Sequence, residues 1–325
     1  MVRDEAAFRQ LFHTPAELST YWTEWAQHIH DDPGIPWGIP SVDKHVIPMR
    51  PGDLVGLLAR PGHGKSSIMA YHALQEARRI MARGQQDKEV VVYITWESSA
   101  EEIENFWAAR GEYSATDVAW GRVPMDQVKR DAIKRAKIPI WTIGHAIAKA
   151  GQPMPRMTLP AVLGAIESME ADFHVKPKLL LFDYIQLIPI AGQQDRQRQV
   201  TEAPSQLKEL VLRVGAPAVF GVQASREVDK RRYKSPDMAD SQWGSAIEQA
   251  ADKLFGLWMP YRTEGPGADP IPMNDGTSVP VTEELMIMRM LKQRGDAGRK
   301  TWPMYFAPQY LRLAEMEIHN DGPQF

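Results

Sequence analysis

The chain has 325 residues, 43% of them hydrophobic and 24% charged, which is ordinary for a globular protein with a sizeable core. Its formal net charge of -3 excludes a globally basic surface, so any contact with nucleic acid must come from local patches. The lack of cysteine excludes disulfides, thiolate metal sites and cysteine nucleophiles. Because no signal-like segment and no uncharged apolar run of about 18 residues occurs, we expect a cytoplasmic protein without membrane contact.

The first predicted element is a helix from Pro15 to Ile29. Thr14, Pro15 and Glu17 stand where N-cap, N1 and N3 residues form a capping box. The connector at residues 30–40 would let the helix lie on a neighbouring subunit, but composition alone favours packing on its own domain. The residues at helical spacing that give it one apolar face are Leu18, Tyr21, Trp22, Trp25 and Ile29.

A phosphate-binding loop is predicted next. Residues 59–66, "ARPGHGKS", match the pattern G-x-x-x-x-G-K-[ST], except that Ala59 replaces the first glycine. An apolar strand precedes the loop and an amphipathic helix ending at Gly84 follows it. Because backbone N–H groups in such a loop donate to phosphate oxygens, we expect ATP and Mg²⁺ here. The predicted nucleotide-binding residues are Arg60, Pro61, Gly62, His63, Gly64, Lys65, Ser66 and Ser67.

Individual roles follow from that pattern. Lys65 would contact the β- and γ-phosphates, and the Ser66 hydroxyl would ligate Mg²⁺. Gly62 and Gly64 would let the backbone approach the phosphates closely. The side chain of His63 is expected to be solvated and to have no role. The alternative for the whole segment is a strand-to-helix turn that binds nothing.

Strands and helices then alternate along the chain, which predicts an α/β protein with a mostly parallel sheet covered on both faces. A capping box of Ser99 and Glu102 opens one helix, which is predicted to end at Gly111. Several antiparallel strands are expected in 284–313. The other predicted strands lie in 90–95, 138–143, 179–182, 216–225 and 252–260, and a further helix at 159–173.

Four polar residues directly follow predicted strands: Lys65, Glu97, Asp183 and Gln223. The carboxyl ends of parallel strands share one edge, so we expect these side chains to converge. Asp183 would orient Mg²⁺, directly or through water. Glu97 would be the general base for the attacking water, with a helix-capping carboxylate as the alternative. The residues alone do not separate Gln223 as a γ-phosphate contact from an ordinary strand-end glutamine.

Six segments, in this order, resemble the motor domain of DnaB-type replicative helicases over about residues 35 to 315. The resemblance includes alanine at the first glycine position of the loop. It implies a RecA-like fold with antiparallel C-terminal strands, a ring of usually six subunits, and ATP-driven movement along single-stranded DNA that unwinds a replication fork. The segments are "RPGDLVGLLARPGHGKSS", "YITWESSAEEIENFWAARG", "LLLFDYIQLI", "GVQASRE", "GSAIEQAAD" and "LKQRGDAG".

The resemblance also implies roles and a domain division. Gln223 becomes a γ-phosphate sensor, and Lys292 and Arg294 become cations supplied to the site of the adjacent subunit, the alternative being a solvated hairpin. Residues 1–34 become a linker helix and connector, and residues 35–325 the motor domain. The helix Pro15 to Ile29 would then dock on the neighbouring motor domain, and not on its own domain as composition alone favours.

DNA contacts are expected in two basic segments, "DRQRQ" at 195–199 and "REVDKRRYK" at 226–234, as loops facing a central channel. The alternative is a pair of solvated charge clusters. The family's N-terminal collar domain has no counterpart in the sequence, so contacts with a loader or primase are left undefined. A RecA-like assembly, loading or recombination factor that does not unwind DNA is the alternative function. The predicted DNA-binding residues are Arg196, Arg198, Lys230, Arg231, Arg232, Gln242 and Gly244.

Overall fold

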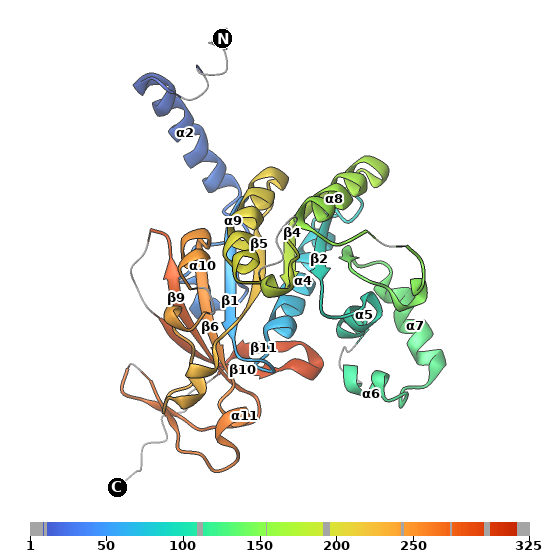
Figure 1. Cartoon of the computed structure of the whole chain (residues 1–325), viewed down its shortest axis with the longest axis vertical. Helices are drawn as coiled ribbons and strands as arrows, with labels where there is room; N and C mark the ends of the chain where they lie inside the picture. The colour runs from blue at the N-terminus through green and yellow to red at the C-terminus, as the bar shows by residue number, and fades with distance from the viewer. Residues whose placement is uncertain are drawn as a thin grey trace.

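The computed structural model describes residues 9, 12–108, 113–153, 155–190, 196–241, 244–273, 275–295 and 300–316. Its centre is a nine-stranded sheet in the order β11-β10-β9-β6-β1-β5-β4-β2-β3. The six strands β6, β1, β5, β4, β2 and β3 run parallel to one another. Strand β9 pairs antiparallel with β6, and β10 and β11 continue the antiparallel pairing. The predicted mostly parallel sheet with antiparallel C-terminal strands is therefore confirmed (Figure 1).

The strands of this sheet agree with the apolar runs of the sequence. The alternation predicted for 284–313 resolves into three strands, β9 to β11. A two-stranded ribbon, β7 and β8, was not predicted, because each of its strands has two residues. The bounds are β1 (Leu54–Ala59), β2 (Glu89–Thr95), β3 (Ile140–Ile143), β4 (Lys176–Asp183), β5 (Ala218–Gln223), β6 (Lys253–Trp258), β7 (Ile271–Pro272), β8 (Ser278–Val279), β9 (Leu285–Gln293), β10 (Thr301–Ala307) and β11 (Arg312–Glu315).

Helices cover both faces of the sheet, so its central strands are apolar on both sides. Alternate residues of one strand enter two separate cores: Leu57 packs in the core that includes α4, and Leu58 in the core that includes α8 and α9. The helices are α2 (Pro15–Asp31), α3 (Pro40–Asp43), α4 (Lys65–Ala82), α5 (Ala100–Ala108), α6 (Ala115–Ala119), α7 (Met125–Arg135), α8 (Leu159–Phe173), α9 (Arg196–Val214), α10 (Gly244–Ala250) and α11 (Tyr261–Glu264).

Helix α2 begins at the predicted capping box. The Thr14 side chain accepts from the Glu17 N–H, and the Glu17 carboxylate accepts from the Thr14 N–H. Figure 1 shows the helix projecting away from the sheet. Its apolar face is exposed, with Trp22 66% accessible, and none of its residues is buried. Packing on its own domain, which composition favoured, is therefore wrong, because the connector directs the helix away from that domain's core.

Of two other predictions, one falls on residues outside the described ranges and one is wrong. The end of the helix predicted at Gly111 lies outside the described residues; α5 is described as far as Ala108. The loop predicted at 195–199 is wrong from Arg196 onward, because α9 begins there. No helix within the described ranges combines the length and hydropathy needed to cross a bilayer.

Candidate functional site

The four residues predicted to converge do share one edge of the sheet. Strands β1, β5, β4 and β2 are consecutive neighbours in the sheet. The last residue of β1, Ala59, is in register with Gln223, and Thr95 is in register with Asp183. Lys65 opens α4 directly after the loop that follows β1, and Glu97 comes two residues after the end of β2. The sequence rule for parallel sheets therefore brings all four to the carboxyl edge.

Two glycines of the phosphate loop have backbone conformations that other residues rarely adopt. Gly62 has φ +78° and Gly64 has φ +85°. A Cβ on Gly64 would lie 2.6 Å from Cε1 of Phe306, so β10 closes over the loop as well. The loop is thus a tight cradle whose shape requires glycine at both positions.

Lys65 lies between the loop and two carboxylates. Its Nζ donates to the carbonyl oxygens of Ala59, at 3.1 Å, and Arg60, at 3.3 Å. Burial lowers the pKa of Lys65 to about 8, while the charges of Asp183 and Glu97 oppose that shift. Triphosphate oxygens would supply the counter-charge that these two neutral carbonyls lack.

His63 is not the solvated residue that the sequence suggested. Its side chain is buried, with 5% of the residue exposed, and Nδ1 accepts a 2.9 Å hydrogen bond from the Met259 N–H. Burial, reinforced by the charge of Arg262, lowers the pKa of His63 to about 4. The expectation failed because the bond joins the loop to the end of β6, a contact between residues far apart in sequence. Neutral His63 therefore anchors the loop to the strand beside β1.

Asp183 has a partner that the sequence analysis missed. The hydroxyl of Tyr93, on β2, donates to its Oδ2 at 2.8 Å. Burial raises the pKa of Asp183, whereas the hydroxyls of Ser66 and Tyr93 act in the opposite direction. Tyr93 gave no sequence signal beyond its type, because an aromatic residue within an apolar strand reads as core.

The same carboxylate fits a magnesium ion. Its second oxygen, Oδ1, is buried and has no hydrogen bond from any of the residues described. The Ser66 hydroxyl lies within interaction range of the same carboxylate, and Mg²⁺ prefers such oxygen ligands together with phosphates and water. No cluster of three or more histidine and carboxylate side chains suited to a metal occurs in the described ranges. This edge provides one carboxylate and one hydroxyl, to which a bound nucleotide would add phosphate oxygens.

Glu97 is not the cap of α5 and lies near Asp183 and Lys65. Ser99 and Glu102 form the capping box of α5, as predicted, with N–H···O distances of 2.7 and 3.2 Å. Burial and the charge of Asp183 raise the pKa of Glu97, and Lys65 opposes them. A raised carboxylate pKa moves it toward the range in which a general base works near neutral pH.

Gln223 is held through its backbone. Its N–H donates to Oε1 of Gln186 and its carbonyl accepts from Nε2 of Gln186, both at 3.3 Å. Gln186 belongs to the short 3₁₀ helix Ile185–Leu187 that follows β4. The side chain of Gln223 is therefore carried by a fixed backbone at the end of β5.

Two arginines lie at the loop, Arg60 within it and Arg262 on α11. Arg60 pairs with Asp229 at 2.9 Å and donates to the Ala224 carbonyl at 3.0 Å. Arg262, on α11, was missed by the sequence analysis, although a Cβ on Gly62 would lie 3.5 Å from its Nη1. Its side chain has no hydrogen bond or ion pair within the part of the chain that is described. The short turn that brings α11 back over the loop has no local sequence signature.

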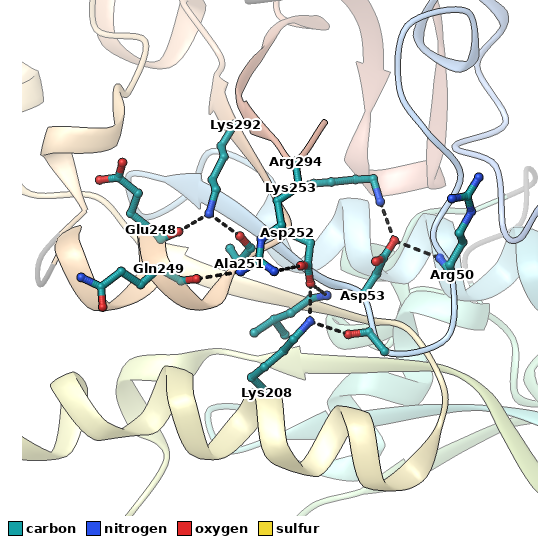
Figure 2. Close-up of polar contacts among 12 residues, drawn as sticks. Arg50, Asp53, Lys208, Glu248, Gln249, Ala251, Asp252, Lys253, Lys292 and Arg294 are labelled. Carbon is teal, nitrogen blue, oxygen red and sulfur yellow. Dashed lines mark hydrogen bonds and ion pairs between the residues drawn. The ribbon is translucent and has the colours of Figure 1, made fainter. Parts of the chain in front are cut away.

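Lys292 and Arg294 lie at the opposite edge of the sheet. Lys292 is in register with Leu254, next to the start of β6, and β6 is parallel to β1. Lys292 donates to the carbonyls of Glu248 and, at 2.6 Å, Ala251. Figure 2 shows both cations near Asp252, while the Arg294 side chain, in the turn after β9, stays 58% exposed.

The predicted DNA-binding residues have unequal surroundings. Arg231 forms a two-bond ion pair with the buried carboxylate of Asp240, and Lys230 pairs with Glu227 at 2.7 Å. Arg232 is exposed and forms no hydrogen bond or ion pair with the residues described. Gln242 lies outside the described residues. The backbones of Arg196 and Arg198 lie in helix α9, and that of Gly244 begins α10.

Comparison with solved structures shows the fold. The ATPase domain of G40P is 17% identical, with a TM-score of 0.73, and the match covers 94% of this chain and all of that one. A DnaB-like replicative helicase, solved in a study of its interactions with primase, is 17% identical with a TM-score of 0.71 over 94% of this chain and 67% of its own. These likenesses confirm the predicted RecA-like core.

Comparison of sequences identifies relatives. The replicative DNA helicase DnaC of Bacillus subtilis (strain 168) is 26% identical over 239 residues, which is 70% of this chain and 48% of that protein. The replicative DNA helicase DnaB of Geobacillus stearothermophilus is 26% identical over 229 residues, 69% of this chain and 47% of that protein. The chain thus spans about half the length of the curated relatives it matches. The family profile described as DnaB-like helicase C terminal domain matches residues 34–315, and the chain belongs to that family.

Proposed function

We propose that this chain is the ATP-hydrolysing motor of a ring-shaped replicative DNA helicase, which moves along single-stranded DNA and unwinds the duplex at a fork. The observation that carries the proposal is the division of the hydrolytic residues between two edges of one sheet. Lys65, Glu97 and Asp183 lie at the carboxyl edge, and Lys292 and Arg294 at the opposite edge.

At the carboxyl edge, the chain's own residues would bind and orient the substrate. Lys65 would exchange its two carbonyl contacts for the β- and γ-phosphates. Asp183, fixed by Tyr93, and Ser66 would hold Mg²⁺, which neutralises charge on the phosphates when bound. Glu97 would take the proton of the attacking water, and Gln223 would contact the γ-phosphate or that water.

Arg262 adds a cation to this cradle. It lies over Gly62 in the same chain, and phosphate oxygens are the acceptors that a guanidinium prefers. We therefore place Arg262 among the nucleotide-binding residues, together with residues 60–67 of the loop.

Arg294 cannot serve its own cradle. The six residues of β1 alone span about 20 Å, which exceeds the reach of an arginine side chain. A second copy must therefore present this edge to the cradle, as it does in a closed ring of head-to-tail subunits. A cation supplied in this way is worth about 10³–10⁵ in hydrolytic rate.

Helix α2 supplies a second reason for assembly. Leu18, Tyr21, Trp22 and Trp25 are exposed along one face of it. Exposed contiguous apolar faces mark interaction surfaces. We propose that residues 1–34 form the linker and dock this face on the neighbouring motor domain, residues 35–325, of a hexamer.

The DNA strand would contact the segment around Arg232. Arg231 and Lys230 are engaged in ion pairs within the chain, so Arg232 is the better candidate among the three. Phosphate contacts of this kind weaken as salt rises. The helix beginning at Arg196 and the turn before Gly244 are the other proposed contacts, and partners such as a loader or primase would bind elsewhere on the ring.

The test is ATP hydrolysis with and without single-stranded DNA, together with unwinding of a forked duplex. We expect Lys65→Ala and Arg294→Ala each to abolish unwinding while rings still assemble. In a mixture of the two variants, some sites combine an intact cradle with an intact Arg294, so hydrolysis should exceed that of either variant alone. DNA-stimulated hydrolysis without unwinding would instead indicate a loading or assembly factor, and full hydrolysis by a monomer would contradict the shared site.

A further inference from the structure

Arg294 is held in place from three directions. Its N–H donates to the carbonyl of Asp252 at 3.0 Å, and its Nη1 pairs with Oδ1 of the Asp252 carboxylate at 3.2 Å. Its Nη2 donates to the carbonyl of Gln249 at 3.1 Å. One residue, Asp252, therefore fixes both the backbone and the guanidinium of Arg294 (Figure 2).

The other oxygen of the same carboxylate reaches two further elements. Oδ2 of Asp252 accepts from the N–H of Leu54, the first residue of β1, at 2.8 Å. It also accepts from Nζ of Lys208, on α9, at 2.6 Å. The Asp252 side chain is 10% exposed, whereas that of Arg294 is 58% exposed. The carboxylate is thus a buried anchor, and the guanidinium that it holds faces solvent.

We infer that Asp252 is a positioning residue, which orients Arg294 toward the neighbouring subunit's site and ties it to β1 and α9. The inference rests on the proposed role of Arg294. A guanidinium fixed before the reaction loses little freedom when it meets the γ-phosphate, which is the condition for strong stabilisation of developing charge. Without the carboxylate, the guanidinium of Arg294 could still extend to the neighbouring site, but its orientation would no longer be fixed.

The surrounding charges require an anion at this point. Lys208 and Arg294 both pair with Asp252, and Lys292 lies close enough for Arg294 and Lys208 to lower its pKa after the larger effect of burial. Three cations converge here, and carbonyl oxygens at the end of α10 accept from two of them. Asp252 offsets their mutual repulsion at this edge.

The anchor also lies between the proposed DNA contacts and the proposed finger. Helix α9 carries Lys208 and begins at Arg196, while α10 carries the Gln249 carbonyl and begins at Gly244. Both helices follow segments proposed to face the DNA strand. A displacement of α10 would move the Gln249 carbonyl that holds Arg294, and one of α9 would move Lys208, which holds Asp252, so we expect the DNA-stimulated rate to depend on Asp252 more than the basal rate does.

The test uses Asp252→Asn in assembled rings. We expect kcat for ATP with DNA present to fall roughly ten- to a hundredfold, less than for Arg294→Ala. KM for ATP should stay unchanged, because the cradle lies at the other edge of the sheet. Asp53→Asn is the matched control: its carboxylate pairs with Lys253 at the same edge and accepts from the Arg50 N–H, and the described structure shows no contact between it and Arg294.

A second variant separates positioning from folding. Asp252→Asn leaves Lys208 without its anion, whereas Asp252→Asn combined with Lys208→Met removes both charges, so it should fold at least as well and still show the low kcat. Mixing Asp252→Asn with Lys65→Ala should restore hydrolysis, since the first variant contributes an intact cradle and the second an intact Arg294.

The outcomes are distinct. If Arg294→Ala is impaired and Asp252→Asn rings keep the wild-type kcat, the inference is overturned and the proposed function stands. If Asp252→Asn raises KM without lowering kcat, its effect falls on its own cradle and the inference is again overturned. Wild-type hydrolysis by Arg294→Ala rings would overturn both the inference about Asp252 and the proposed role of Arg294 in a shared site.

Discussion

Tyr93 and Asp183 form a buried hydrogen bond of 2.8 Å between neighbouring strands at the carboxyl edge of the sheet. Because the phenol donates to Oδ2, it fixes the plane of the carboxylate and leaves Oδ1 without a hydrogen bond from the residues described. Burial and the adjacent negative charge raise the pKa of Tyr93, so the phenol stays protonated and remains a donor. The pair thus orients the proposed metal ligand before the metal arrives.

Removing this donor should weaken the response to magnesium. In Tyr93→Phe, the carboxylate loses a charge-assisted hydrogen bond, which is worth roughly 1.5–3 kcal/mol. We expect the Mg²⁺ concentration for half-maximal hydrolysis to rise about tenfold, measured by titration at saturating ATP. Tyr71→Phe, on α4, is the control and should titrate as the wild type does. An unchanged Mg²⁺ midpoint in Tyr93→Phe would contradict the role of the pair.

The sequence predicted the sheet and one edge of the site because these depend on local patterns. Apolar runs mark the parallel strands, and the residues that follow them, such as Glu97 and Asp183, must share an edge. The contacts that hold the site together join residues far apart in the chain. Tyr93 to Asp183 and His63 to Met259 are examples, and no spacing rule encodes either bond.

The errors have the same physical origin. The resemblance implies a loop at 195–199, but a basic segment can equally open a helix, and α9 starts at Arg196. The self-packing of α2 was judged from its apolar face alone, whereas the path of the connector decides where that face lies. Local composition determines which side chains of a segment can be buried. The rest of the chain determines the surface against which they pack.

Removing the cation over Gly62 should weaken nucleotide binding. In Arg262→Ala, one charge-assisted contact to a phosphate is lost, so we expect the Kd for a non-hydrolysable ATP analogue to rise about tenfold. The difference between variant and wild type should shrink at high salt. Arg78→Ala, on the exposed side of α4, is the control. Equal affinities for Arg262→Ala and the wild type would remove Arg262 from the site.

The buried histidine of the loop should make the protein sensitive to acid. The pKa of His63 is about 4 in the folded chain and near 6.5 when exposed, so the unfolded state binds the extra proton first as the pH falls. The contribution of His63 to the free energy of unfolding is therefore fully present above pH 6.5. It is lost as the pH falls from 6.5 to about 4, and the loss is at most about 3 kcal/mol.

A non-titrating acceptor isolates that effect. His63→Asn keeps an acceptor, Oδ1, for the Met259 N–H and cannot be protonated, so its free energy of unfolding should fall less steeply between pH 6.5 and 4. His72, whose pKa burial lowers to about 3, titrates in both proteins and cancels in the comparison. Parallel pH profiles from urea unfolding would show that His63 is not the sensitive group.

The two reasons for glycine in the loop can be measured separately. Gly64 and Gly84 both have positive φ, +85° and +66°, but a Cβ on Gly64 meets Phe306 at 2.6 Å and one on Gly84 meets nothing within 4 Å. Gly84→Ala should therefore cost only the backbone strain, about 1–2 kcal/mol of unfolding free energy. Gly64→Ala should cost more and should also abolish ATP binding, because the clash moves the cradle. Urea unfolding measures both, and equal losses would mean that β10 yields to the added methyl group and does not fix the loop.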